Sequence, residues 1–107
     1  MTVDEALALA TAMRPCELDR EVLIALLLDL EEQLKLEVGK ERTVPRAVTR
    51  TELTVPAPFD RVYWTYLASM IDLAQSNTDA YRLTDALYRE SREAYVRWHQ
   101  RTVGPGR

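Results

Sequence analysis

The chain contains little cysteine, glycine or histidine, and each shortage excludes a class of chemistry. Cys16 is the only cysteine among 107 residues, so an intrachain disulfide is excluded and a reducing compartment is expected. The three glycines, Gly39, Gly104 and Gly106, form no glycine-rich phosphate loop. His99 is the only histidine and no ligand-spacing motif accompanies it, so we predict no metal site. We expect His99 to be partly exposed near a helix C-terminus, where positive charge is favoured.

Long apolar runs and a secretion signal are also missing. The longest apolar stretch, residues 22–28, falls far short of the roughly 20 residues that span a bilayer, so no membrane association is expected. The N-terminal residues include no basic region, which predicts that the chain is not secreted.

The acidic residues show no pattern typical of a catalytic pair. Glu31 and Glu32 precede Lys35, and arginines interleave with Glu90 and Glu93, which predicts solvated helix faces with local ion pairs. Catalysis usually needs a nucleophile with its base, a buried carboxylate pair, a metal or a cofactor loop. We therefore predict that the chain is not an enzyme and binds no cofactor.

The composition is that of one globular domain, which we assign to residues 1–101, followed by a flexible tail at residues 102–107. The net charge of −3 argues against a dedicated nucleic-acid binder. Residues 1–38 carry three Lys/Arg against nine Asp/Glu, whereas residues 39–107 carry eleven against eight. This polarity fits a subunit whose acidic end meets a neighbour's basic end, but also a chance distribution over a solvated surface.

Hydrophobic periodicity predicts a mainly α-helical fold, a small bundle that ends in a long helical hairpin. The predicted helices span about residues 3–13, 18–38, 58–76 and 79–101. Thr2 and Glu5 form a capping box, Gly39 ends the second helix and Pro58 starts the third. The last two helices are joined by a short turn, in which Asn77 or Thr78 caps the fourth.

The centre of the second helix is apolar on all sides, which predicts that it is buried on most of them. So short a chain has few elements to cover it, so other subunits are expected to supply part of the cover. Residues 40–56 are predicted to form an extended arm, because apolar and polar residues alternate there. Either the arm pairs near Val44 in a short β-hairpin, or it adds to a strand of a neighbour.

The fourth helix carries a seam at spacings of three and four, made of Tyr81, Thr84, Tyr88, Ser91, Tyr95 and Trp98. Leu83, Leu87 and Ala94 form a second apolar line beside it. Arginines interleave with the aromatic residues, as they do in surfaces that hold phosphates and stack on bases. The aromatic residues fall at core spacing, however, which favours packing with a solvated or partner-facing rim.

Three segments each resemble a segment of one known protein family. They are residues 14–17 (RPCE) with the leucine-rich helix after them, 52–60 (ELTVPAPFD) and 94–102 (AYVRWHQRT). They are similar to an "RPN"-like turn before "LSELD", an "ELLVP" segment with a "PYD" helix start, and a closing "FARWYNRT". These features resemble the head-tail connector, or adaptor, proteins of tailed bacteriophages and prophages. The chain departs from them at residues 75–78, where the family often has "NGE", and in the middle of the fourth helix.

The resemblance implies a structural protein of the virion neck, made in the cytoplasm of the bacterial host. It implies a homo-oligomeric ring, expected to be a dodecamer, between the portal protein and a stopper or tail-completion protein. DNA would pass through its lumen without sequence-specific binding. The implied portal contacts are Tyr95, Arg97, Trp98, Arg101 and Arg107. The implied contacts with a neighbouring subunit or the stopper are Thr49, Thr51, Leu53, Val55, Leu23 and Leu27.

Two other functions fit the same residues. One is a small helical regulatory protein that binds a single cellular partner as a monomer or dimer. The other is a nucleic-acid-associated phage accessory protein that uses the arginines of the fourth helix.

Overall fold

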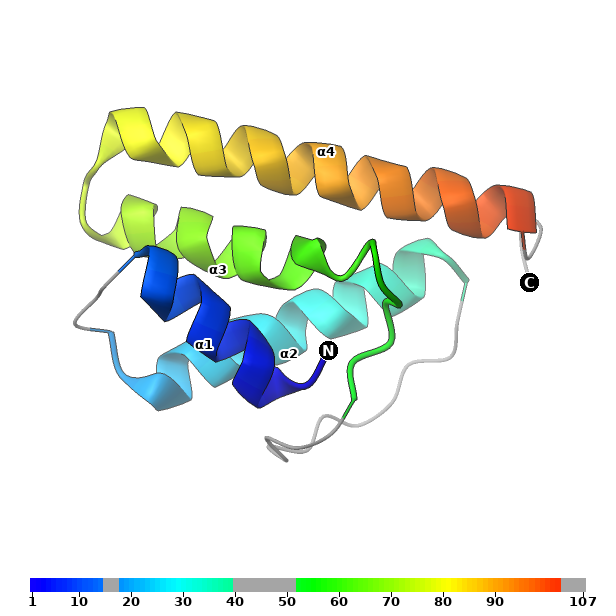
Figure 1. Ribbon diagram of the computed structural model, residues 1–107, viewed down its shortest axis with the longest axis horizontal. Helices are drawn as coiled ribbons and strands as arrows, with labels where there is room; N and C mark the ends of the chain where they lie inside the picture. Colours follow the sequence, from blue (N-terminus) through cyan, green and yellow to red (C-terminus); the bar gives the residue numbers. More distant parts are fainter. Residues whose placement is uncertain (15–17, 40–51, 103–107) are drawn as a thin grey trace.

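The computed structural model describes residues 1–14, 18–39 and 52–102, which form four helices (Figure 1). These are α1 (Val3–Met13), α2 (Arg20–Glu37), α3 (Arg61–Ala74) and α4 (Thr78–Thr102). The mainly α-helical prediction is confirmed, and every predicted helix boundary lies within three residues of the observed one.

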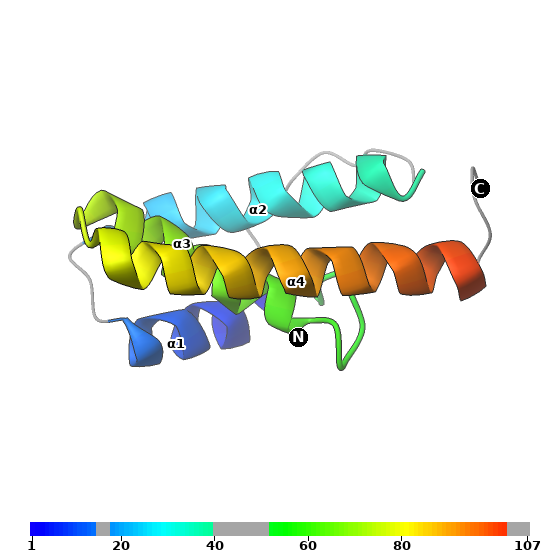
Figure 2. The same ribbon diagram turned by 90° about the horizontal axis from the view of Figure 1, so that it is seen from above.

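Helix α3 forms the centre of the fold and packs against each of the other three helices, most extensively against α4. Helix α4 has 25 residues and is about 37 Å long at 1.5 Å per residue, so it spans nearly the full 39 Å of the long axis. The two helices run antiparallel, as predicted for a hairpin (Figure 1). Seen from above, α1 and α2 lie on opposite sides of this hairpin (Figure 2).

The helix ends follow local sequence signals. Thr2 Oγ1 accepts from Glu5 N at 3.2 Å and Thr2 N donates to Glu5 Oε1 at 2.9 Å, which confirms the capping box. Gly39 follows α2 with φ of 80°, a conformation that a residue without a β-carbon adopts at little cost. Asn77 Oδ1 accepts from Ala80 N at 3.3 Å and caps α4.

Helix α3 begins at Arg61 rather than at Pro58, so this part of the prediction is wrong. Residues 57–60 form a turn instead, in which Phe59 N donates to Pro56 O at 2.9 Å. The turn brings the Phe59 ring to 5.2 Å from the ring of Trp98 on α4. The local proline signal could not reveal this long-range contact.

Helix α2 divides its apolar residues between two faces. Four leucines point into the core of the chain: Leu23, Leu27, Leu30 and Leu34. On the other face, Val22 is 43% exposed and Leu36 is 56% exposed. Within the chain, α3 and its neighbours therefore cover one face of α2 and leave the other open, and cover by other subunits stays a prediction.

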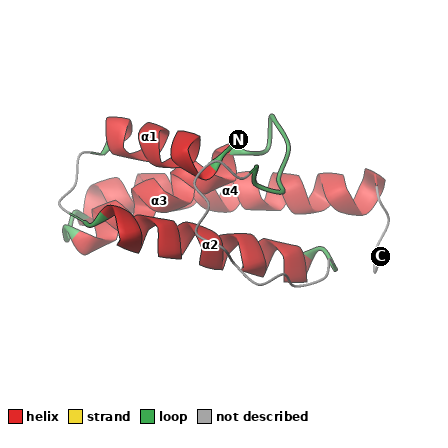
Figure 3. Cartoon of the chain, turned by 90° about the horizontal axis from the view of Figure 1, so that it is seen from below, coloured by secondary structure: helices red, strands yellow, loops and turns green. Residues whose placement is uncertain are grey.

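Segment 52–55, the described end of the predicted arm, is held by the chain itself. Glu52 forms an isolated antiparallel bridge with Thr2, and Leu53 N donates to Met1 O at 2.9 Å. The side chains of Leu53 and Val55 are buried. The described residues contain helices and loops but no strand (Figure 3), so the predicted β-hairpin is not shown. Thr49 and Thr51 lie outside the described residues.

Candidate functional site

A buried carboxylate joins α2, α3 and segment 52–55. Glu31 accepts hydrogen bonds from the Tyr63 hydroxyl at 2.7 Å, from Thr54 N at 2.8 Å and from Thr54 Oγ1 at 3.0 Å. The same tyrosine oxygen accepts from Val55 N at 2.9 Å. We call Glu31, Thr54, Val55 and Tyr63 the Glu31 cluster. It ties the described end of the arm to two helices.

The Glu31 cluster corrects the expectation of a solvated acidic face, because Glu31 is only 6% exposed and Glu32 only 7%. Lys35 Nζ lies 3.8 Å from Glu32 rather than pairing with Glu31. Burial, with a smaller contribution from the Glu31 charge, raises the pKa of Tyr63 far above its ordinary value of 10.0. Tyr63 therefore stays protonated and donates to Glu31 at every physiological pH. This arrangement fastens a segment and presents no reactive group to solvent.

A second buried carboxylate, Asp72, joins the end of α1 to the α3–α4 hairpin. Its side chain is fully buried, and Arg14 Nε lies 2.9 and 3.2 Å from its two oxygens. Thr84 Oγ1 on α4 donates to it at 2.9 Å. Sequence reasoning missed this pair. The available signal was the position of Asp72, one turn after Ala68 and two turns after Thr65, both of which are buried.

The C-terminal part of α4 contains the residues implied for portal contact, and the structure divides them between core and surface. Tyr95 is 1% exposed, and its ring lies 6.1 Å from that of Trp98. Trp98 is half-buried under Phe59, whereas Arg97 and Arg101 are exposed. Tyr95 thus supports this end of the helix from inside and offers no surface to a partner. Arg107 lies outside the described residues.

His99 belongs to the same aromatic cluster and not to the helix surface. It is 3% exposed, and its ring packs edge-on against Tyr95 at 5.9 Å and against Trp98 at 6.4 Å. The expectation of a partly exposed histidine is therefore wrong. The residue continues the buried seam of α4 one turn beyond Tyr95, which the spacing of four residues could have indicated.

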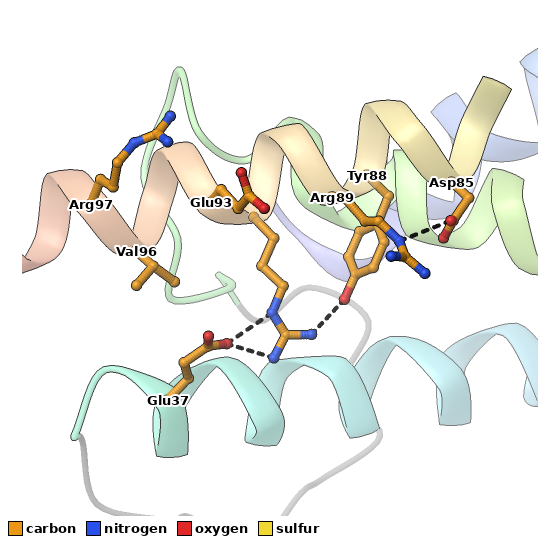
Figure 4. A pocket seen from close by; sticks show the side chains of 8 residues that line it. Glu37, Asp85, Tyr88, Arg89, Glu93, Val96 and Arg97 are labelled. Atoms are coloured by element: carbon orange, nitrogen blue, oxygen red, sulfur yellow. Dashed lines mark hydrogen bonds and ion pairs between the residues drawn. The ribbon is translucent and has the colours of Figure 1, made fainter. Parts of the chain in front are cut away.

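An open groove of about 530 Å³ separates the end of α2 from α4 (Figure 4). Arg92 crosses it, donating from Nε and Nη2 to Glu37 Oε2 at 2.8 and 2.5 Å and from Nη1 to the Tyr88 hydroxyl at 2.7 Å. Arg89 pairs with Asp85 at 2.9 Å within α4. The groove is lined by three arginines and three carboxylates, so its charges balance and favour neither an anion nor a cation.

The subunit-contact residues implied on α2 and the arm also lie in the core. Leu23, Leu27, Leu53 and Val55 are each 7% exposed or less. In this conformation they pack within the chain, so any neighbour must contact other residues. Seven other large apolar side chains are exposed, by 43% to 68%, and they are spread over all four helices. They are Leu9 and Met13 on α1, Val22 and Leu36 on α2, Leu73 on α3, and Leu83 and Leu87 on α4.

The sequence matches no protein-family model, and neither a curated protein nor a solved structure matches it significantly.

Two classes of site are not found in the described part of the chain. Residues 1–14, 18–39 and 52–102 contain no group of three or more His, Cys, Asp or Glu that could hold a metal ion. Within the same ranges, none of the four helices has the length and apolarity needed to cross a membrane. The surface features of the described residues include the groove, a smaller cavity of about 120 Å³ at the α3–α4 turn, the exposed arginines of α4 and the exposed apolar side chains.

Proposed function

We propose that the chain is a structural assembly protein: a head-tail adaptor that forms a ring between a portal protein and a stopper or tail-completion protein. The supporting observation is that all four helices carry exposed large apolar side chains although the core is closed. Contiguous exposed apolar side chains mark surfaces that pack against other chains, and two exposed pairs, Leu9 with Met13 and Leu83 with Leu87, lie one helical turn apart. The choice of an adaptor among such proteins is supported by the resemblance of residues 14–17, 52–60 and 94–102.

The exposed surface for portal contact is formed by Arg97, Arg101 and the outer part of Trp98, at the C-terminal end of α4. Arginine and tryptophan are the residues that contribute most to protein interfaces. The half-buried ring of Phe59 and the buried ring of Tyr95 pack against Trp98 and hold it in place. A fixed aromatic residue loses little conformational freedom when a partner binds it.

Charge favours this function over the nucleic-acid alternative. The chain carries 14 Lys/Arg against 17 Asp/Glu, a net charge of −3 that opposes tight binding to phosphates. An adaptor ring needs DNA to pass without being held, which an acidic protein allows. Retention on immobilised DNA at low salt, lost steeply as salt rises, would instead support the accessory protein.

The test is binding to purified rings of the portal protein from the same phage or prophage. Arg97→Glu with Arg101→Glu reverses two exposed charges, so it should abolish docking and leave helicity unchanged. Arg82→Glu is the matched control, because Arg82 is exposed near the other end of α4. The arginines are preferred to Trp98, whose truncation would also remove its contact with Phe59. Unchanged docking of the double variant would show that this end of α4 is not the portal surface.

A further inference from the structure

We propose that residues 52–59 form a strap that opens and closes as a unit, and that the strap holds Trp98 in place for portal contact only while it is closed. The opening is a property of the chain by itself, whereas its consequence for docking rests on the proposed function. The strap leads into the start of α3 (Figure 1) and joins the Glu31 cluster to the C-terminal end of α4.

The strap is fastened to the rest of the chain by few hydrogen bonds, and most of them end on side chains. Leu53 N donates to a backbone oxygen at 2.9 Å. Thr54 N and Val55 N donate instead to side-chain oxygens of the Glu31 cluster, at 2.8 and 2.9 Å. Residues 52–59 contain neither helix nor strand. A segment held in this way opens at a lower free energy than the helices that surround it.

Two prolines make the middle of the strap stiff. A proline fixes its own φ angle and restricts the residue before it. Pro56 and Pro58 therefore restrict the backbone of all four residues from 55 to 58. Phe59 N then donates to Pro56 O at 2.9 Å and closes a turn. Movement at Val55 is passed on to Phe59, because the residues between them have little freedom to absorb it.

The far end of the strap is the ring of Phe59, which packs against the end of α4. Its centre lies 5.2 Å from the ring centre of Trp98 and 6.4 Å from that of Tyr95. The other described ring contacts of Trp98 are with Tyr95 and His99, which belong to α4 itself. Among these contacts, only the one with Phe59 ties Trp98 to another part of the chain. An open strap lets Trp98 take other rotamers, and a partner would then have to order it again at a cost.

Hydrogen exchange of two amides tests whether the strap opens as a unit. The amides of Leu53 and Phe59 both bond to main-chain oxygens, so a side-chain substitution leaves their acceptors in place. Tyr63→Phe removes the hydroxyl of the Glu31 cluster that accepts from Val55 N. It should speed exchange of both amides by the same factor, at least about tenfold, because exchange follows the population of the open form.

Asp72→Asn is the matched control for lost stability. It weakens a buried ion pair outside the strap, so it should lower the global stability and leave exchange of the two amides unchanged. Thr54→Val is a milder second variant that removes a single bond of the Glu31 cluster, and it should raise both rates by a smaller common factor. The strap is refuted if the control speeds both amides as much as Tyr63→Phe does, or if either strap variant speeds one amide and not the other.

Exchange measured in the presence of purified portal rings tests the consequence for docking. Rings that bind only the closed strap, at about ten times their Kd, should slow exchange of both amides by about tenfold. The charge-reversed variant Arg97→Glu with Arg101→Glu is the control and should show no slowing. Rings that bind without slowing exchange refute the coupling and keep the adaptor. Rings that do not bind refute the adaptor, while equal factors in the free protein keep the strap.

Discussion

Removing the Tyr63 hydroxyl tests how firmly the Glu31 cluster holds segment 52–55. Tyr63→Phe keeps the ring in its fully buried position and takes away one oxygen. That oxygen donates to Glu31 at 2.7 Å and accepts from Val55 N at 2.9 Å. The substitution therefore leaves a buried amide without its acceptor and a buried carboxylate with one donor fewer.

The expected cost follows from these two losses. A hydrogen bond to a charged group contributes about 1.5–3 kcal/mol, and an unsatisfied buried donor costs about 1–3 kcal/mol. Because the losses share one atom, we expect about 3 kcal/mol in total, a large part of the roughly 5–15 kcal/mol by which a domain is stable. For a chain of this size the melting temperature should fall by about 10–20 °C.

Urea and thermal unfolding followed by circular dichroism measure this loss, and Tyr88→Phe supplies the matched control. The Tyr88 hydroxyl accepts from Arg92 at 2.7 Å beside the open groove, where Arg92 keeps Glu37 and water is close. The control should lose less than about 1.5 kcal/mol. Equal losses in the two variants would mean that the Glu31 cluster contributes no more than a single hydrogen bond beside the groove.

Three further predictions follow from buried and capping groups. Burial raises the pKa of Tyr63, Tyr66 and Tyr95 above 10.0. Above about pH 10 the unfolded chain therefore releases protons that the folded chain keeps, so the free energy of unfolding should fall as pH rises. Urea titrations at about pH 8 and 11 measure this fall, which should be shallower in Tyr63→Phe. Asp72→Asn should cost about 2–3 kcal/mol in urea unfolding because it leaves Arg14 beside a neutral, buried partner. An Asp4→Asn control at an exposed pair should cost under about 1 kcal/mol, and comparable costs would show that burial adds nothing. Thr2→Ala should lower stability by about 1 kcal/mol through loss of the α1 cap, whereas Thr2→Ser should keep it.

The parts of the fold that local chemistry decides were predictable from the sequence. The capping box of Thr2 and Glu5 marks the start of α1, and the glycine at position 39 marks the end of α2. The three-and-four spacing of the α4 seam gave its buried face, including Tyr88 and Tyr95. Each of these signals acts within a few residues, where helix geometry alone relates the side chains.

The buried charges were not predictable in the same way. Glu31 has Lys35 one turn away in the sequence, so a local ion pair explained it, yet its partners come from residues 54 and 63. Asp72 finds Arg14 58 residues away. Periodicity could place Asp72 on the buried face of its helix, but it carries no information about which distant segment supplies the partner of a buried carboxylate.

The apolar excess of α2 was predicted as a need for other subunits, and the structure changes the reasoning behind that prediction. Leu23 and Leu27 are satisfied within the chain and exert no demand for a partner. The exposed apolar side chains are instead Val22 and Leu36 on α2 and residues such as Leu83 on α4, and a hydrophobicity count cannot separate exposed from buried ones. A proposed contact with other chains must therefore be sought among these exposed side chains, because burying an already buried leucine removes no further apolar surface from water.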